Sequence, residues 1–217
     1  MPSIDRILEA SLYATLNFLP YVLLAIAPFL QSLRFSRRTT VVLLLLATCL
    51  QMPLYVLDLW VSLPPWLLTV IGVALDFSSY LILVKANVGK LTFMLLLLSN
   101  VANLLSALSK CLEGVFFPAF ATEGYHLSHS LLLLACNLVV LPLLYLYMRR
   151  YFTADFAQSK QGSHWRYLWL IPLTFYFIWF YHLYSDTHGS SDDLLLLPEQ
   201  AFFLFSLPYC LRIRALT

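Results

Sequence analysis

Long apolar segments alternate with short polar stretches along most of the chain. Several of these segments exceed the roughly 18–20 apolar residues that a helix needs to cross a bilayer core of about 30 Å. The pattern predicts an all-α fold, a polytopic transmembrane helical bundle in which neighbouring helices pack antiparallel across short connections. We expect a single transmembrane domain over residues 1–217 with about seven spans, at approximately 7–31, 39–61, 66–84, 91–112, 128–148, 166–184 and 194–211.

The composition also indicates a membrane protein. Of the 217 residues, 61% are apolar and only 11% are charged, whereas an ordinary soluble domain has about 25% charged residues. A soluble globule of this size could not bury so much apolar surface. The first apolar run, Ile7–Leu30, is longer than the roughly 7–15 residues of a signal-peptide core. We therefore expect it to be retained as the first span.

Basic residues gather in the segments that follow the first, third, fifth and seventh predicted spans. These segments hold 11 of the 13 Lys and Arg residues, whereas most acidic residues lie at the other ends of the spans. Loops rich in Lys and Arg stay on the cytoplasmic side of a membrane. The sequence therefore predicts an outside N-terminus and a cytoplasmic C-terminus. The longest basic loop, 149–166, is expected to contact anionic lipid.

A polar stripe follows one face of the predicted span 91–112. Its members are three or four residues apart, a spacing that places them on the same side of a helix. They are Ser99, Asn103, Ser106, Lys110 and Glu113. Asn100 lies in the same run of leucines. Because polar groups inside a bilayer are energetically costly, we expect these side chains to face something other than lipid.

Five predicted spans each place one strongly polar side chain at a similar depth. Counted at about 1.5 Å per residue, these residues lie about 9–10 residues below the outer surface. They are Asn17, Gln51, Asp76, Asn103 and Asn137. Asp76 is the costliest, at roughly 2.5–3.5 kcal/mol for an acid at the centre of a span. We expect it to be protonated, hydrogen-bonded to these amides, or exposed to a water-filled cavity.

Two interpretations of this polar layer stay open. Asn, Gln and Ser side chains join membrane helices through hydrogen bonds of about 0.6 kcal/mol each, and we favour this role for Asn17, Gln51 and Asn137. For Asp76 and the polar stripe we favour a functional polar cavity. The predicted ligand-binding or polar-switch residues are Asp76, Asn100, Asn103, Ser106, Lys110 and Glu113.

A rim of ionisable residues is predicted at the outer surface. Its members are Asp58, Lys110, Glu113, Glu123, His126, His129, His182, Asp186 and His188. Cys111 and Glu113 could approach His126 and His129, but no tight metal-ligand motif is present. We therefore expect solvated loop histidines and no metal. The outer loop 113–126 suits either the wall of a pocket for an apolar or peptidic ligand or a loop lying against the membrane.

The sequence carries no catalytic signature. It contains no HExxH, GxSxG, Walker A or GxGxxG motif, and its inner loops are too short to hold a domain. We therefore expect no enzymatic activity, no cofactor and no nucleic-acid partner. The cysteines show no paired spacing and are expected to be small apolar core residues. They are Cys49, Cys111, Cys136 and Cys210.

Four segments combine long apolar runs with particular Pro, Arg and Asn placements. They are NFLPYVLLAIAPF (17–29), LRFSRRTT (33–40), GKLTFMLLLLSNVANLLSALSKCLEG (89–114) and WRYLWLIPLTFYFIWFYHLY (165–184). They resemble the N-terminal membrane region of clostridial sensor histidine kinases with a GHKL-type ATPase domain, similar in layout to the peptide-pheromone receptor AgrC. The resemblance covers nearly the whole chain. It implies a multi-pass sensor in a bacterial plasma membrane that forms a homodimer when joined to a kinase module.

Kinase chemistry does not carry over to this chain. The family carries a phosphoacceptor His on a helix after the last span, and none of the five histidines fits that role. A full-length parent would be a histidine kinase, and we expect the chain to be its sensor region alone. That region would bind an extracellular small molecule or peptide and pass a helix shift to a cytoplasmic output. The alternatives are a small-solute-binding membrane transport subunit and a non-catalytic membrane assembly protein.

Overall fold

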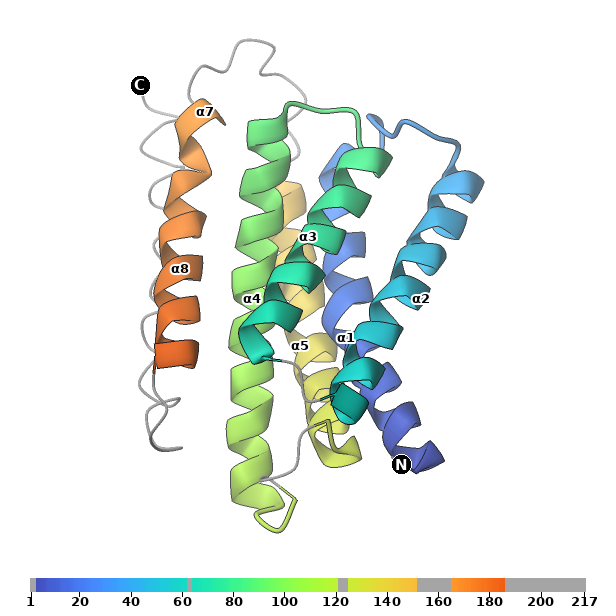
Figure 1. The fold of residues 1–217 in the computed structure, drawn as a ribbon. Helices are drawn as coiled ribbons and strands as arrows, with labels where there is room; N and C mark the ends of the chain where they lie inside the picture. The colour runs from blue at the N-terminus through green and yellow to red at the C-terminus, as the bar shows by residue number, and fades with distance from the viewer. Residues whose placement is uncertain (1–2, 62–63, 121–124, 152–164, 186–217) are drawn as a thin grey trace.

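The computed structural model describes residues 3–61, 64–120, 125–151 and 165–185. Within this part of the chain the regular elements are helical, so the all-α prediction is confirmed there. Helices α1 to α5 run alternately up and down, and α8 packs against α4 (Figure 1). The elements are α1 (Ile4–Ile26), the 3-10 turn η1 (Ala27–Phe29), α2 (Arg37–Val61), α3 (Pro65–Leu83), α4 (Val88–Phe116), α5 (Leu127–Tyr151), α7 (Trp165–Leu168) and α8 (Leu170–Ser185).

Five of the described helices are long and apolar enough to cross a membrane, and α8 contains a shorter apolar helix, Leu170–Tyr181. The chain is therefore a multi-pass membrane protein. The first five predicted spans coincide with the long helices, and the sixth falls on α7 and α8. The predicted seventh span, 194–211, lies outside the described residues, so the number of seven spans stays a prediction. Most of the basic loop 149–166 lies outside them too, as do the rim residues Glu123, Asp186 and His188.

The central helix of the bundle is α4, which packs against α1, α3, α5, α7 and α8. Its buried residues extend from Lys90 to Glu113. By contrast, α2 and α5 carry many exposed leucines and valines, such as Leu46, which is 59% exposed, and Leu138, which is 68% exposed. Extended apolar surfaces of this kind suit hydrocarbon rather than water. The apolar helices therefore contact the lipid bilayer.

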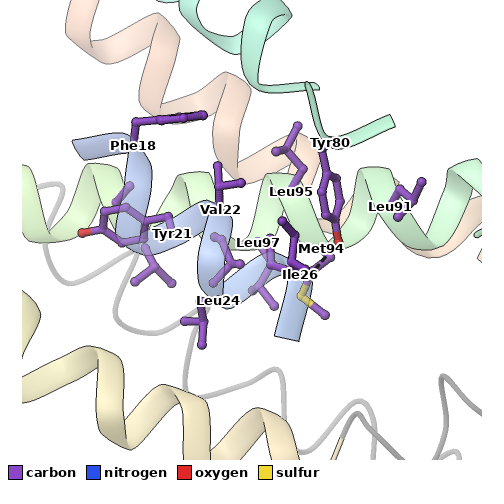
Figure 2. Close-up of a cluster of buried hydrophobic side chains, with 14 of the residues drawn as sticks. Phe18, Tyr21, Val22, Leu24, Ile26, Tyr80, Leu91, Met94, Leu95 and Leu97 are labelled. Carbon is purple, nitrogen blue, oxygen red and sulfur yellow. Dashed lines mark hydrogen bonds between the residues drawn. The ribbon is translucent and has the colours of Figure 1, made fainter. Parts of the chain in front are cut away.

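The side chains labelled in Figure 2 come from α1, α3 and α4 and belong to the hydrophobic core, to which α2 and α5 also contribute. Tyr80 of α3 is fully buried there. Its hydroxyl donates a hydrogen bond to the backbone carbonyl of Ala25 over 2.8 Å, and its ring meets that of Phe29 edge-on, with 6.3 Å between centroids. The helix changes to a 3-10 turn at Pro28, which has no N–H to donate. Carbonyls of the last turn of α1 are therefore available to a partner such as Tyr80.

The α1–α2 and α3–α4 connections lie side by side at one end of the bundle. Leu33 and Val84 form an isolated antiparallel bridge, and Lys85 N donates to Ser32 O over 2.8 Å. Lys and Arg residues gather at this end, which we call the basic end: Arg34, Arg37, Arg38, Lys85, Lys90, Arg149 and Arg150. The opposite end, where α1 starts and α4 stops, is called the acidic end. It carries Asp5, Glu9, Asp58 and Glu113.

Asn137 of α5 contacts α1 where Pro20 interrupts the helical hydrogen bonds. Pro20 has no N–H for the carbonyl of Leu16, four residues earlier. Asn137 Nδ2 donates to that carbonyl over 3.3 Å, and its Oδ1 accepts a hydrogen bond from the Tyr21 hydroxyl over 2.7 Å. The two hydrogen bonds of the Asn137 side chain therefore support the interpretation that it joins α5 to α1.

Replacing Asn137 with leucine is expected to lower the free energy of unfolding by about 1–2 kcal/mol, because two polar groups lose their partner. Unfolding by heat or SDS in detergent micelles measures the change. Tyr21→Phe is the matched control, since it removes only one of the two hydrogen bonds and should have a smaller effect. Unchanged unfolding of Asn137→Leu would contradict this role.

Candidate functional site

A cavity of about 410 Å³ lies inside the bundle, lined by residues of α1, α2, α3, α4 and α8. Ligand sites typically enclose about 300–1,000 Å³. Along α4 the lining extends from Leu95 to Lys110, a distance of about 22 Å. Val22 and Leu95 line the part toward the basic end, and Asp58, Lys110 and Tyr125 line the part toward the acidic end. We call this space the central cavity.

Four of the six predicted site residues line the central cavity: Asp76, Asn103, Ser106 and Lys110. Asn100 is instead buried between α4 and α8, where its Nδ2 donates to Leu96 O and Pro172 O, each over 2.9 Å. Glu113 is also buried outside the cavity lining. It accepts hydrogen bonds from Lys110 Nζ over 2.7 Å and from the Ser128 hydroxyl of α5. The ligand-binding role of these residues stays a prediction.

Asp76 is held on the cavity wall by Gln51. Gln51 Nε2 donates to Asp76 Oδ1 and also lies 3.4 Å from the carbonyl oxygen of Gly72. The Gln51 side chain is buried, so this contact joins α2 to α3 in the interior of the bundle. One of the three states expected for Asp76, a hydrogen bond to a neighbouring amide, is thus present, and the carboxyl also lies on the cavity lining.

Two buried amide atoms on the cavity lining have no hydrogen-bond partner among the described residues, Asn17 Oδ1 and Asn103 Nδ2. The Tyr13 hydroxyl and Ser106 Oγ are 3.0 Å apart, which fixes the register of the antiparallel helices α1 and α4. Asn17 lies one helical turn from Tyr13, and Asn103 one turn from Ser106 in the opposite chain direction. The two amides are therefore at about the same level. Buried polar atoms are normally hydrogen-bonded, so this level suits a ligand or water that both donates and accepts.

An aromatic cluster lines the cavity toward the acidic end. The ring centroids of Tyr13, Tyr55 and Tyr125 are 5.2–5.7 Å apart. Tyr125 has a positive φ of 56°, and its hydroxyl donates to Asp58 Oδ2 over 3.0 Å. Burial, together with the negative charge of Asp58, raises the pKa of Tyr125 far above its ordinary value. The hydroxyl therefore stays protonated at physiological pH and remains a donor to Asp58.

The prediction of solvated loop histidines is wrong for His129. Its side chain is buried and its ring lies 5.2 Å from that of Tyr13, while His129 Nε2 is 3.3 Å from Ser106 O. The reason is that α5 begins at Leu127, so His129 falls in its first turn and packs between α1 and α4. His126 precedes the helix and stacks on Phe120, with centroids 4.4 Å apart.

Charged and polar side chains connect α1, α4 and α5 at the acidic end. Glu9 accepts a hydrogen bond from Arg6 over 3.0 Å and another from the backbone N–H of Leu127 over 3.2 Å. His126 Nε2 is 4.0 Å from Glu9 Oε1, and His126 Nδ1 is 2.8 Å from Ser128 Oγ. Within the described ranges, His, Cys, Asp and Glu residues form no group of three or more that could hold a metal ion.

The aromatic part of the cavity lining was missed by sequence reasoning, although the sequence carries a signal for it. Tyr13, Asn17 and Tyr21 are four residues apart on α1, and Gln51, Tyr55 and Asp58 follow at spacings of four and three on α2. All six residues line the cavity. This is the same helical spacing that defines the polar stripe on α4. Counting tyrosines together with amides on each span would have found it.

Comparison with protein-family models, curated proteins and solved structures finds no match to this chain. The class of the protein therefore rests on its own fold and cavity. They define a polytopic helical membrane protein with a polar and aromatic cavity between its helices.

Proposed function

We propose that the chain is a signal-receiving membrane module that binds an extracellular small molecule or short peptide in the central cavity. The observation that carries this proposal is the cavity itself, which has the volume of a ligand site and polar atoms on its wall that lack a hydrogen-bond partner among the described residues. Asp76, Asn103, Ser106 and Lys110 would form its polar side. Ionisable side chains inside a membrane, such as that of Asp76, are by default candidates for a functional site.

The proposed orientation places the acidic end outside and the basic end in the cytoplasm. The seven Lys and Arg residues named at the basic end support it, whereas Arg6 and Lys110 lie at the acidic end. The polar and aromatic part of the cavity then lies nearer the outside. A ligand there would also touch Tyr176 and Trp179 of α8, so binding would move the last described helix and shift the segment that leads to a cytoplasmic output.

The finer proposal is that this module is the membrane region of a GHKL-type sensor histidine kinase, which acts as a homodimer in a bacterial plasma membrane. The sequence resemblance supports it, together with the proposed orientation. Extending the source gene sequence past the codon for Thr217 tests it. A frame that continues into a helix with a phosphoacceptor His and an ATP-binding domain would support the kinase assignment, and an immediate stop codon would contradict it.

Removing the Asp76 charge from the cavity wall is expected to weaken binding and abolish signalling. In native mass spectrometry of the chain purified from its own membranes, we expect a bound small molecule that Asp76→Asn reduces at least tenfold, whereas Lys110→Gln disturbs signalling by releasing Glu113 from its ion pair. In an intact parent kinase the same changes should abolish the response. The matched controls are Asp5→Asn and Lys85→Gln, which alter exposed residues outside the cavity. Signalling that survives both cavity changes would reject the proposal.

The other classes of function give different results in the same experiments. A small-solute transport subunit would co-purify with an ATPase partner. A non-catalytic assembly protein would tolerate Asp76→Asn without loss of function or stability, because its polar layer would only join helices, as Asn100 and Asn137 do.

A further inference from the structure

The geometry points to a small organic cation as the ligand, with an ammonium group at Asp76 and an apolar or aromatic body along the tyrosine-lined wall. This inference rests on the proposed function, since it names the class of ligand for the same cavity. Three features of the described residues carry it: the balance of charge on the wall, the position of Asp76, and the aromatic rings on the same cavity wall.

The charge on the cavity wall favours a cation. Among the described residues that line the cavity, the carboxylates are Asp58 and Asp76, and the ammonium group is that of Lys110. Lys110 is paired with Glu113 over 2.7 Å, so its charge is already balanced from within the protein. An anionic ligand would approach two carboxylates across a low-dielectric space, where like charges repel strongly. A cationic ligand would instead be attracted to the same two carboxylates.

Asp76 lies deep in the bundle, where an ion pair with a cationic ligand would contribute more binding free energy than at the surface. It is eleven residues into α3, about 16 Å along the helix axis from Pro65. Gln51 supplies one hydrogen bond to Oδ1, whereas a carboxylate has about four lone-pair sites. Asn17 Oδ1, which has no hydrogen-bond partner among the described residues, lies on the same cavity lining. Together these oxygens suit a group with several N–H donors, which is the chemistry of a primary ammonium.

Aromatic side chains from three helices line the same cavity as Asp76. Tyr13 and Tyr55 line the cavity from α1 and α2, and Tyr176 and Trp179 line it from α8. Aromatic faces attract organic cations, by up to about 2 kcal/mol where water is excluded, and they also pack against an apolar body. Carboxylates combined with aromatic walls distinguish an amine from a neutral solute of the same shape, which would gain only the packing.

The test uses the full chain in lipid nanodiscs and three probes of matched shape: 2-phenylethylamine, 2-phenylethanol and 3-phenylpropanoate. Calorimetric titration at neutral pH, corrected with empty nanodiscs, is expected to show at least tenfold tighter binding of the amine than of the alcohol. The carboxylate probe should bind weakest. Asp76→Asn should reduce amine binding to the level of the alcohol. Asp76→Glu keeps the charge and should retain the preference, and Asp5→Asn is the control for a carboxylate outside the cavity.

The outcomes separate this inference from the proposed function. Equal binding of amine and alcohol, unchanged by Asp76→Asn, would overturn the cation assignment and leave the cavity as a binding site for neutral ligands. Tighter binding of the carboxylate probe would overturn it in favour of an anion. Absence of saturable binding for every probe would also reject it, whereas the proposed function would still stand or fall on the bound molecule in native mass spectrometry. If Asp76→Asn fails to fold, Asp76→Glu still tests the inference, because it keeps the charge and should retain the preference for the amine.

Discussion

Replacing Glu113 with alanine is expected to lower the free energy of unfolding by about 2–4 kcal/mol. The Glu113 side chain is fully buried and receives hydrogen bonds from Lys110 and Ser128. Its removal leaves the Lys110 ammonium group without its nearest counter-charge. The effect is smaller than the roughly 3–5 kcal/mol of a fully buried pair, because the Lys110 side chain is 36% exposed. Unfolding in detergent, with SDS as the denaturant, measures it.

A double-mutant cycle distinguishes the ion pair from simple loss of packing. If the pair is the cause, Lys110→Ala combined with Glu113→Ala should be less destabilising than the sum of the two single changes, since neither charge is then left alone. Additive effects would show that the two side chains stabilise the bundle independently. Glu9→Ala at the same end serves as a comparison, because Glu9 is partly exposed and pairs with Arg6 at the surface.

Tyr80→Ala is expected to destabilise the bundle by about 2–4 kcal/mol. The side chain is completely buried between α1 and α4, so truncation leaves a cavity that the surrounding helices fill only in part. In lipid the unfolded helices keep their apolar surroundings, and the loss therefore comes mainly from packing and from the bond to Ala25 O.

Tyr80→Phe separates these two contributions, because it keeps the ring and removes only the hydroxyl. We expect it to cost about 0.6 kcal/mol, the average for hydrogen bonds between membrane helices, and no more than about 1.7 kcal/mol. Both variants are compared with the wild type by thermal unfolding in the same detergent. If Tyr80→Phe were as destabilising as Tyr80→Ala, the hydrogen bond rather than the ring would hold α3 against α1.

The helices and much of the polar wall could be predicted because both follow from spacing along single segments. Apolar length gives the long helices, and steps of three and four place Ser99, Asn103, Ser106 and Lys110 on one face. All four line the cavity. At about 100° per residue, Asn100 lies about a quarter turn from that face, and it accordingly meets α8 instead.

What could not be predicted depends on which helices are neighbours. Glu113 follows the polar stripe, but the stripe drifts around α4, and by that level Glu113 faces Ser128 of α5. The buried environment of His129 likewise depends on contacts with α1 and α4. Hydrophobic periodicity shows which side of a helix is polar, whereas it does not show which other helix that side will meet.

The hydrogen bond between Asn100 and Pro172 attaches α8 to α4 near the start of α8. Pro172 lies near the start of α8, and Asn100 holds it against the central helix. Trp179, on the cavity wall, is about 10 Å further along the axis. A small displacement of Trp179 by an occupant of the cavity would tilt α8 about the Asn100 contact, and the displacement would grow with distance from that pivot. Asn100, which does not line the cavity, would thus determine how far the end of α8 moves when the cavity is occupied.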